Sequence, residues 1–359
     1  MSQQSRRKVW KLLDKYDLIE GEVAENAVDS PWYIKLLLSI SGWFGASFLV
    51  LFVGGILGLI LGRNVENFPL LLLFIGGGLI FFAYTIFKER QNDFLEHFML
   101  ALSITGQVMV IASLFFMFDN RIDTGIIFVT AIFQAFLMWV IPNYIHRMMS
   151  SFFMTLAFSY LFYKVGEPLI PTMILTFVVA WLWMNEFNFK ERKKVEAIAY
   201  GQTVALFTLK YSLMGSTYYL YELFSYSKNM PKFHFWWLEV ASIMTLVYVL
   251  WMILKEAQKE YDTKSIFLLF GAVMLLGFLS FEVGGLVLGV MLLLIGFAHS
   301  HRLLMGLGIL SSLTFLSYYY YYLGETLMDK AEVLAFMGVA LLLSYLLMKV
   351  FLKQEVSDV

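Results

Sequence analysis

The 359-residue sequence has no cysteine and few charged residues. Without cysteine it can hold no disulfide, no thiolate nucleophile and no cysteine-ligated metal or iron–sulfur centre. Charged residues make up 15% of the chain, whereas about a quarter is usual in soluble domains. This leaves too little polar surface to cover a soluble globule of this size, so lipid is the expected solvent. The net charge of −1 provides no basic excess to neutralise the phosphates of a nucleic acid.

Motifs that carry enzymatic chemistry are also missing. The sequence contains no P-loop, GxSxG, HExxH or dinucleotide fingerprint, and no paired-carboxylate motif in a large loop. His299-Ser300-His301 brings two imidazoles together without an acidic partner, which is an incomplete metal site. We therefore assign no catalytic, cofactor-binding or metal-binding residue, and we expect neither enzyme activity nor a cofactor.

Long apolar stretches dominate what the sequence does contain. Hydrophobic residues form 60% of the chain, and the mean hydropathy is +0.73. A helix needs about 17–25 mostly apolar residues to cross the hydrocarbon of a bilayer. Stretches near this length predict an all-α, polytopic transmembrane bundle of about twelve helices, near 36–62, 67–87, 97–118, 124–142, 148–163, 169–185, 196–220, 234–254, 265–281, 283–298, 303–323 and 331–351.

The boundary between the ninth and tenth apolar stretches is the least distinct in the sequence. At ~1.5 Å per residue, 265–298 would form a helix ~50 Å long, which is too long for one span and enough for two. Glu282 together with Gly284 and Gly285 predicts a hairpin at this point.

Basic residues predict the orientation of the bundle. With the N-terminus inside, 19 of the 26 Lys and Arg residues lie on the cytoplasmic side, six lie outside and Lys210 falls within a span. This bias follows the positive-inside rule and predicts that both termini are cytoplasmic. The expected organisation is a cytoplasmic segment over 1–31, a single multipass membrane domain over 32–353 and a cytoplasmic tail over 354–359.

The N-terminal segment lacks the apolar run of a cleavable signal peptide. Val9, Leu12, Leu13 and Tyr16 follow the spacing of one helical face and predict a short amphipathic helix. Such a helix either rests on the membrane surface or docks a partner, and the same face serves both roles.

Lys210 and Glu239 are the candidate intramembrane polar site. Ionisable groups inside a span are costly and often functional, and a buried cation needs a carboxylate or a wet cavity. Adjacent antiparallel helices would bring the two side chains together. They are then either a substrate or proton site or a structural ion pair, and Lys210 alone could also snorkel outward. Gln107, Gln134 and Gln202 lie in the middle of spans, where interhelical hydrogen bonds account for them.

The second candidate site is a polar cluster at the outer edge of the last helical hairpin. Tyrosine favours the membrane interface, so an aromatic belt is one interpretation. The other is a docking surface for an extracytoplasmic partner or a glycan, shared with a similar cluster at 218–226. Its candidate residues are Tyr319, Tyr320, Tyr321, Glu325, Asp329 and Lys330.

Both ends of the chain resemble one bacterial membrane family. Ser30-Pro31-Trp32-Tyr33-Ile34-Lys35 followed by Gly42-Trp43-Phe44 is similar to the beginning of the family catalogued as domain of unknown function 4401. His301-Arg302, Tyr320-Tyr321-Tyr322-Leu323 and Lys330-Ala331-Glu332-Val333-Leu334 are similar to its end, with Ala331 where serine is common. The resemblance implies a multipass protein of the bacterial inner membrane, with a small membrane-anchored protein as a partner and no agreed catalytic residues.

Two functions are favoured after these exclusions. The first is a non-enzymatic component of an envelope assembly, which fits the missing motifs and the outward polar clusters. The alternative is a transporter or channel for a small solute, proton or lipid, which fits the helix number and Lys210. An intramembrane enzyme ranks third.

Overall fold

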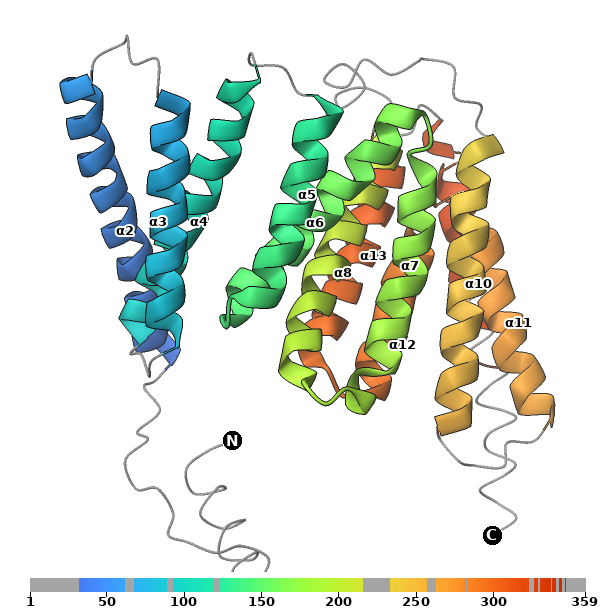
Figure 1. Ribbon diagram of the computed structural model, residues 1–359. Coiled ribbons are helices and arrows are strands. Elements are labelled where there is room, and N and C mark those ends of the chain that lie inside the picture. The colour runs from blue at the N-terminus through green and yellow to red at the C-terminus, as the bar shows by residue number, and fades with distance from the viewer. Residues whose placement is uncertain are drawn as a thin grey trace, which may run out of the picture. The chain divides into compact units, whose positions relative to one another are not determined.

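The computed structural model describes residues 32–61, 68–88, 93–118, 123–215, 233–256, 263–281, 283–322 and, with gaps, 326–346. All regular elements within these ranges are helices (Figure 1). They are α2 (Trp32–Leu61), α3 (Phe68–Phe87), α4 (Asp93–Met117), α5 (Thr124–Val140), α6 (Tyr144–Val165), α7 (Leu169–Met184), the 3-10 helix η1 (Glu186–Asn188), α8 (Arg192–Gly215), α10 (Phe233–Glu256), α11 (Thr263–Leu279), α12 (Leu286–Ala298) and α13 (Arg302–Tyr322).

The helices fall where the apolar stretches predicted them. The break between α11 and α12 is confirmed, because helix ends at Leu279 and begins again at Leu286. Helical backbone also returns at 330–336, inside the twelfth stretch. The predicted helix at the N-terminus and the cluster at 218–226 lie outside the described residues.

Among the residues that the structure describes, four helices are long and apolar enough to cross a membrane: Phe68–Phe87, Phe94–Met117, Trp236–Glu256 and Arg302–Tyr321. Other apolar helices are shorter, such as α5 with 17 residues and α12 with 13. At ~1.5 Å per residue α12 covers ~20 Å, less than the ~30 Å of a bilayer core. These helices are those of a helical membrane protein, and the number of twelve spans stays a prediction.

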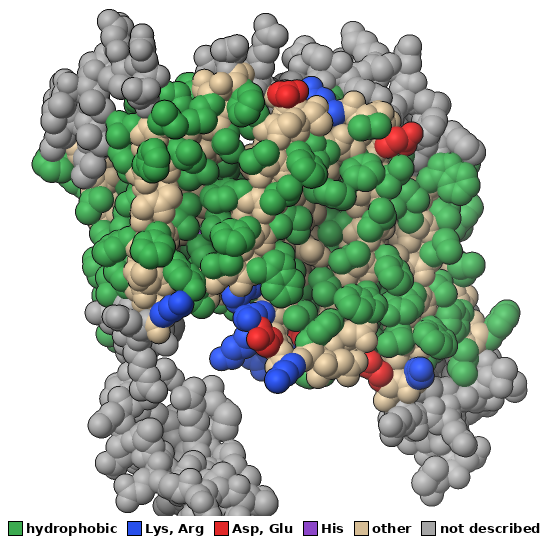
Figure 2. Space-filling view, viewed as in Figure 1, with side chains coloured by type: hydrophobic (Ala, Val, Ile, Leu, Met, Phe, Trp, Pro, Cys, Tyr) green, Lys and Arg blue, Asp and Glu red, His purple; other side chains and the backbone are tan. Residues whose placement is uncertain are grey.

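The surface of these helices is apolar. Figure 2 shows hydrophobic side chains over most of the visible face, with Lys and Arg at its lower and upper edges. Large side chains on helices far apart in the sequence are exposed, for example Phe48 (77%), Phe74 (75%) and Phe267 (80%). Soluble monomers rarely expose contiguous apolar patches of more than a few hundred Å², so this surface suits lipid.

The chain forms two compact units. The first comprises Met1–Val65 and Leu79–Gly106, and the second comprises Glu66–Gly78 and Gln107–Val359. In the first unit, small side chains bring α2, α3 and α4 together around Ala46, Ala83, Met99, Ala101 and Leu102. A Cβ on Gly42 would lie 2.8 Å from the amide nitrogen of Phe98, so α2 and α4 approach closely there.

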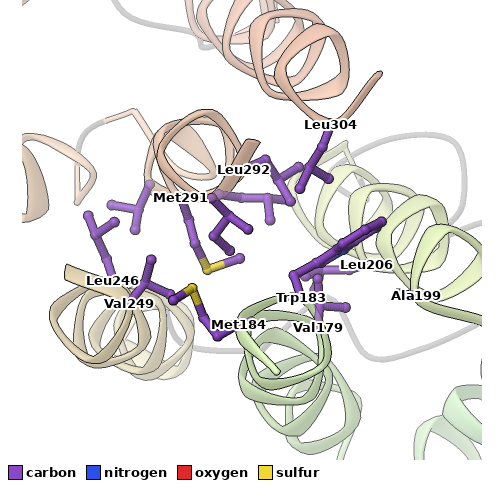
Figure 3. Packing of buried hydrophobic residues seen from close by; sticks show 14 of the residues in the cluster. Val179, Trp183, Met184, Ala199, Leu206, Leu246, Val249, Met291, Leu292 and Leu304 are labelled. Atoms are coloured by element: carbon purple, nitrogen blue, oxygen red, sulfur yellow. The ribbon is translucent and has the colours of Figure 1, made fainter. Parts of the chain in front are cut away.

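The second unit has a core shared by α7, α8, α10, α12 and α13. Its largest buried side chain is Trp183, which donates its indole N–H to Thr203 Oγ1 at 2.9 Å. Figure 3 shows Trp183 and Val179 of α7 facing α8, while Met184 faces Met291 of α12. This core holds the candidate site described below.

Glycines set the spacing between α12 and α13. A Cβ on Gly289 would clash with Ser312 Oγ, and one on Gly308 would lie 2.7 Å from the amide nitrogen of Leu293. Small residues at such positions let membrane helices pack backbone to backbone. By contrast, a Cβ on Gly306 of the same helix would meet nothing within 4 Å.

We expect Gly308→Ala to lower stability by about 1–3 kcal/mol, because overpacking displaces the facing backbone. Gly306→Ala is the matched control and is expected to be neutral or stabilising by up to ~1 kcal/mol, since alanine favours helix. Thermal unfolding of the detergent-purified protein measures both. Equal midpoints for the two variants would contradict the close approach.

Candidate functional site

A buried ion pair joins α8 to α10. Lys210 lies near the end of α8, and Glu239 lies in the second turn of α10. The Lys210 Nζ donates to the Glu239 Oε1 at 3.1 Å, and the two side chains are 0% and 9% exposed. The structure thus brings together the two residues that the sequence singled out within spans.

The turn before α12 contributes a third group. The Gly285 backbone N–H donates to the same Glu239 Oε1 at 3.2 Å. Gly285 is the N-cap of α12 and has φ 81°, a left-handed conformation that glycine adopts without strain. A Cβ there would also lie 2.6 Å from the ring of Phe315. Only glycine meets both conditions, so the hairpin sequence places this amide on the carboxylate.

The other carboxylate oxygen has different surroundings. Glu239 Oε2 is buried and accepts no hydrogen bond from any described residue. Leaving a buried acceptor unsatisfied costs about 1–3 kcal/mol, and more for a charged group. The site therefore neutralises the charge of Glu239 but leaves Oε2 available to a further donor.

Removing one partner of this pair should destabilise the protein strongly. Lys210→Met is expected to cost about 3–5 kcal/mol, because Glu239 would stay buried without a counter-charge. The double variant Lys210→Met/Glu239→Gln should recover much of that loss, since no unpaired charge remains. Denaturant unfolding of the two single variants and the double variant measures the coupling. Lys164→Met, at an exposed lysine of α6, is the control. A stability loss in the double variant that equals the sum of the losses in the two single variants would contradict a coupled pair.

A second charged cluster lies where α7, α8 and the α12–α13 turn meet. Glu186 of η1 is 1% exposed, and its Oε1 accepts from Arg192 Nε at 2.7 Å. Its Oε2 lies 2.6 Å from His301 Nε2. The ring of Trp183 packs edge-on against His301, with centroids 5.3 Å apart. One buried carboxylate thus ties together segments that are 115 residues apart in the chain.

The two imidazoles of the α12–α13 turn, those of His299 and His301, contact different segments of the chain. Ser300 has φ 58°, which is uncommon for a residue with a side chain. On either side of it, His301 pairs with Glu186, while His299 lies 3.5 Å from Glu256 at the end of α10. Within the described residues no three His, Asp or Glu side chains gather in a way that could hold a metal ion. Both imidazoles serve contacts between helices.

The sequence did not reveal this cluster. Glu186 and Arg192 looked like ordinary residues of a charged connection, and nothing local couples Glu186 to His301 across the chain. The one available signal was His299-Ser300-His301, whose missing acidic partners are supplied by other helices.

Replacing Glu186 tests how much this carboxylate contributes to stability. Glu186→Ala leaves Arg192 and His301 without their acceptor, and we expect a loss of about 1–3 kcal/mol, because the hydrogen bonds to the carboxylate are lost while Arg192, 47% exposed, can turn to water. Glu191→Ala is the matched control five positions away. The Lys194 ammonium donates to Glu191 and lowers the pKa of that carboxyl, but the pair is exposed to solvent, so its contribution to stability is small. Similar unfolding midpoints for the two variants would argue against the cluster.

Buried polar side chains also link α4, α5 and α6. Gln134 Nε2 donates to Gln107 Oε1 at 3.0 Å, and Gln107 Nε2 lies 2.5 Å from His146 Nε2. The interhelical hydrogen bonds predicted for Gln107 and Gln134 are thereby confirmed. Arg147 is buried next to them and donates to the carbonyls of Met138 and Ile141 at 2.9 and 2.8 Å, so its guanidinium caps the end of α5.

The candidate tyrosines at the end of α13 do not share one surface. Tyr319 is 1% exposed and packs with Val283, whereas Tyr320 and Tyr321 are 41% and 74% exposed. Lys330 is buried, and its Nζ donates to the Tyr320 carbonyl at 3.0 Å. This bond caps α13 with a cation, which suits the negative end of a helix. The remaining members of the cluster, Glu325 and Asp329, lie outside the described residues.

Comparison with known proteins identifies a family and no activity. A family model described as domain of unknown function (DUF4401) matches residues 31–350. The match includes every helix described above and both charged clusters. No curated protein and no solved structure matches the chain significantly.

Proposed function

The chain belongs to the DUF4401 family of unknown function, and we propose that it is a non-enzymatic, multipass component of an envelope assembly in the bacterial inner membrane. In this proposal about twelve helices cross the bilayer and both termini are cytoplasmic. The apolar surface of the described helices supports the membrane location.

The arrangement of helix ends supports the predicted alternation. The Glu186–His301 and Glu256–His299 contacts place the ends of α7, α10 and α12 on one side of the second unit. The starts of α8 and α13 lie there too. These are connections that the positive-inside rule assigns to the cytoplasm.

The observation that favours assembly over transport is the internal pairing of buried charges. Lys210 is neutralised by Glu239, and the guanidinium of Arg147 is bound by helix carbonyls. Because its own helices bind these buried charges, the protein suits a scaffolding role. The exposed rings of Tyr320 and Tyr321, 5.0 Å apart, then offer an aromatic pair to a membrane-anchored partner on the outer side.

Replacing the exposed tyrosine pair tests this role. Tyr320→Ser/Tyr321→Ser should release a stoichiometric partner during gentle purification from native membranes, with an unchanged unfolding midpoint. Tyr33→Ser, at a tyrosine 52% exposed on α2, is the control and should retain the partner. A wild-type protein that purifies alone would argue against the assembly. A cytoplasm-dependent reporter fused after Val359 tests the topology separately, and silence would mean an odd number of spans.

One observation favours transport as the alternative. Glu239 Oε2 is a buried acceptor with no donor among the described residues, and it lies beside a buried lysine. Intramembrane ionisable groups with spare hydrogen-bonding capacity are typical of proton and solute pathways. Flux across liposomes that contain the purified protein, abolished by Glu239→Gln, would favour this function.

A further inference from the structure

A basic segment that runs from the η1–α8 connection into the first turn of α8 is not explained by either function. Lys190, Arg192, Lys193 and Lys194 fall within five consecutive positions, and we call them the basic collar. Lys194 pairs with Glu191, and Arg192 binds Glu186 through Nε. Lys190 and Lys193 are exposed and form no ion pair with a described carboxylate. The four cations of the collar thus outnumber Glu186 and Glu191, the two carboxylates beside them.

The collar lies at the end of the second unit where other cations gather. His301 joins the α12–α13 turn to Glu186, so Arg302, the next residue, begins α13 at this same end. The His299–Glu256 contact brings the end of α10 there with Lys255. Arg302 and Lys255 are both exposed. In Figure 2 several blue side chains lie along the lower edge of the apolar face, although blue also appears at its upper edge.

Aromatic rings lie between the collar and the apolar surface. Trp181 at the end of α7 is 42% exposed, and Phe187 in η1 is 58% exposed. The Arg192 guanidinium lies 4.3 Å above the ring of Phe187, so charge and ring are in direct contact. Along α7 and η1 the exposed side chains pass from the apolar Ile174 and Phe177 to Trp181 and Phe187, and the cations of the collar follow. A phospholipid has the matching order of acyl chain, glycerol region and phosphate.

We propose that the basic collar, with Phe187 and Trp181, is a binding site for the anionic headgroups of phospholipids in the cytoplasmic leaflet. This inference rests on the proposed membrane location and orientation. Exposed rings beside an apolar helix face favour a lipid over a soluble polyanion, because a soluble ligand would leave those rings in water. Lys190 and Lys193 supply the attraction, and Arg192 retains its terminal NH₂ groups for a phosphate oxygen.

Lipid titration followed by native mass spectrometry tests the site. The wild-type protein should bind phosphatidylglycerol in preference to phosphatidylcholine, and added salt should weaken that preference by screening. Lys190→Gln/Lys193→Gln should weaken phosphatidylglycerol binding about fivefold for each lysine removed. Lys190→Arg/Lys193→Arg should keep it, because the charge is conserved.

A charge-matched control separates this site from overall charge. Lys88→Gln/Lys164→Gln removes two exposed lysines elsewhere and should leave phosphatidylglycerol binding unchanged. Equal binding by the wild type and Lys190→Gln/Lys193→Gln would overturn the inference while leaving the proposed function intact. Failure of the wild type to insert into lipid nanodiscs would instead overturn the membrane location, and the inference with it.

Discussion

Charges inside apolar helices have to be neutralised by the protein itself, and the second unit is organised around that constraint. An unpaired buried charge costs several kcal/mol, which is comparable with the whole stability of a domain. Lys210 meets the constraint through Glu239 on the next described helix, while the buried guanidinium of Arg147, in the first turn of α6, is hydrogen-bonded by the carbonyls at the end of α5. Each solution uses a neighbouring helix, so satisfying the charges also determines which helices are adjacent.

Helix α8 shows how these contacts fix one element along its length. At its first residue, Arg192 binds Glu186 beyond the end of α7. In the middle, Thr203 accepts from the indole of α7, and near the end Lys210 binds α10. Polar contacts are directional, whereas the apolar packing between them tolerates sliding. Three such contacts on one helix therefore define its register against its neighbours.

The two ends of this unit suit different surroundings. One end carries the basic collar and two histidine–carboxylate contacts, and the other carries the exposed tyrosine pair beside the cap that Lys330 forms on α13. In the proposed orientation the first end meets anionic lipid and the second meets a membrane-anchored partner. The apolar surface between the two ends contacts the hydrocarbon of the bilayer and keeps the protein soluble there.

The sequence by itself determined the helices, because apolar runs of fixed length and the glycine break at 284–285 are local properties. It also indicated Lys210 and Glu239, since a charge inside an apolar run stands out wherever its partner lies. Only the tertiary structure decided that Gly285 joins that pair, that Glu186 is buried against His301, and that Tyr319 is buried while Tyr321 is exposed. These facts depend on how helices distant in the chain face one another, which no local pattern records.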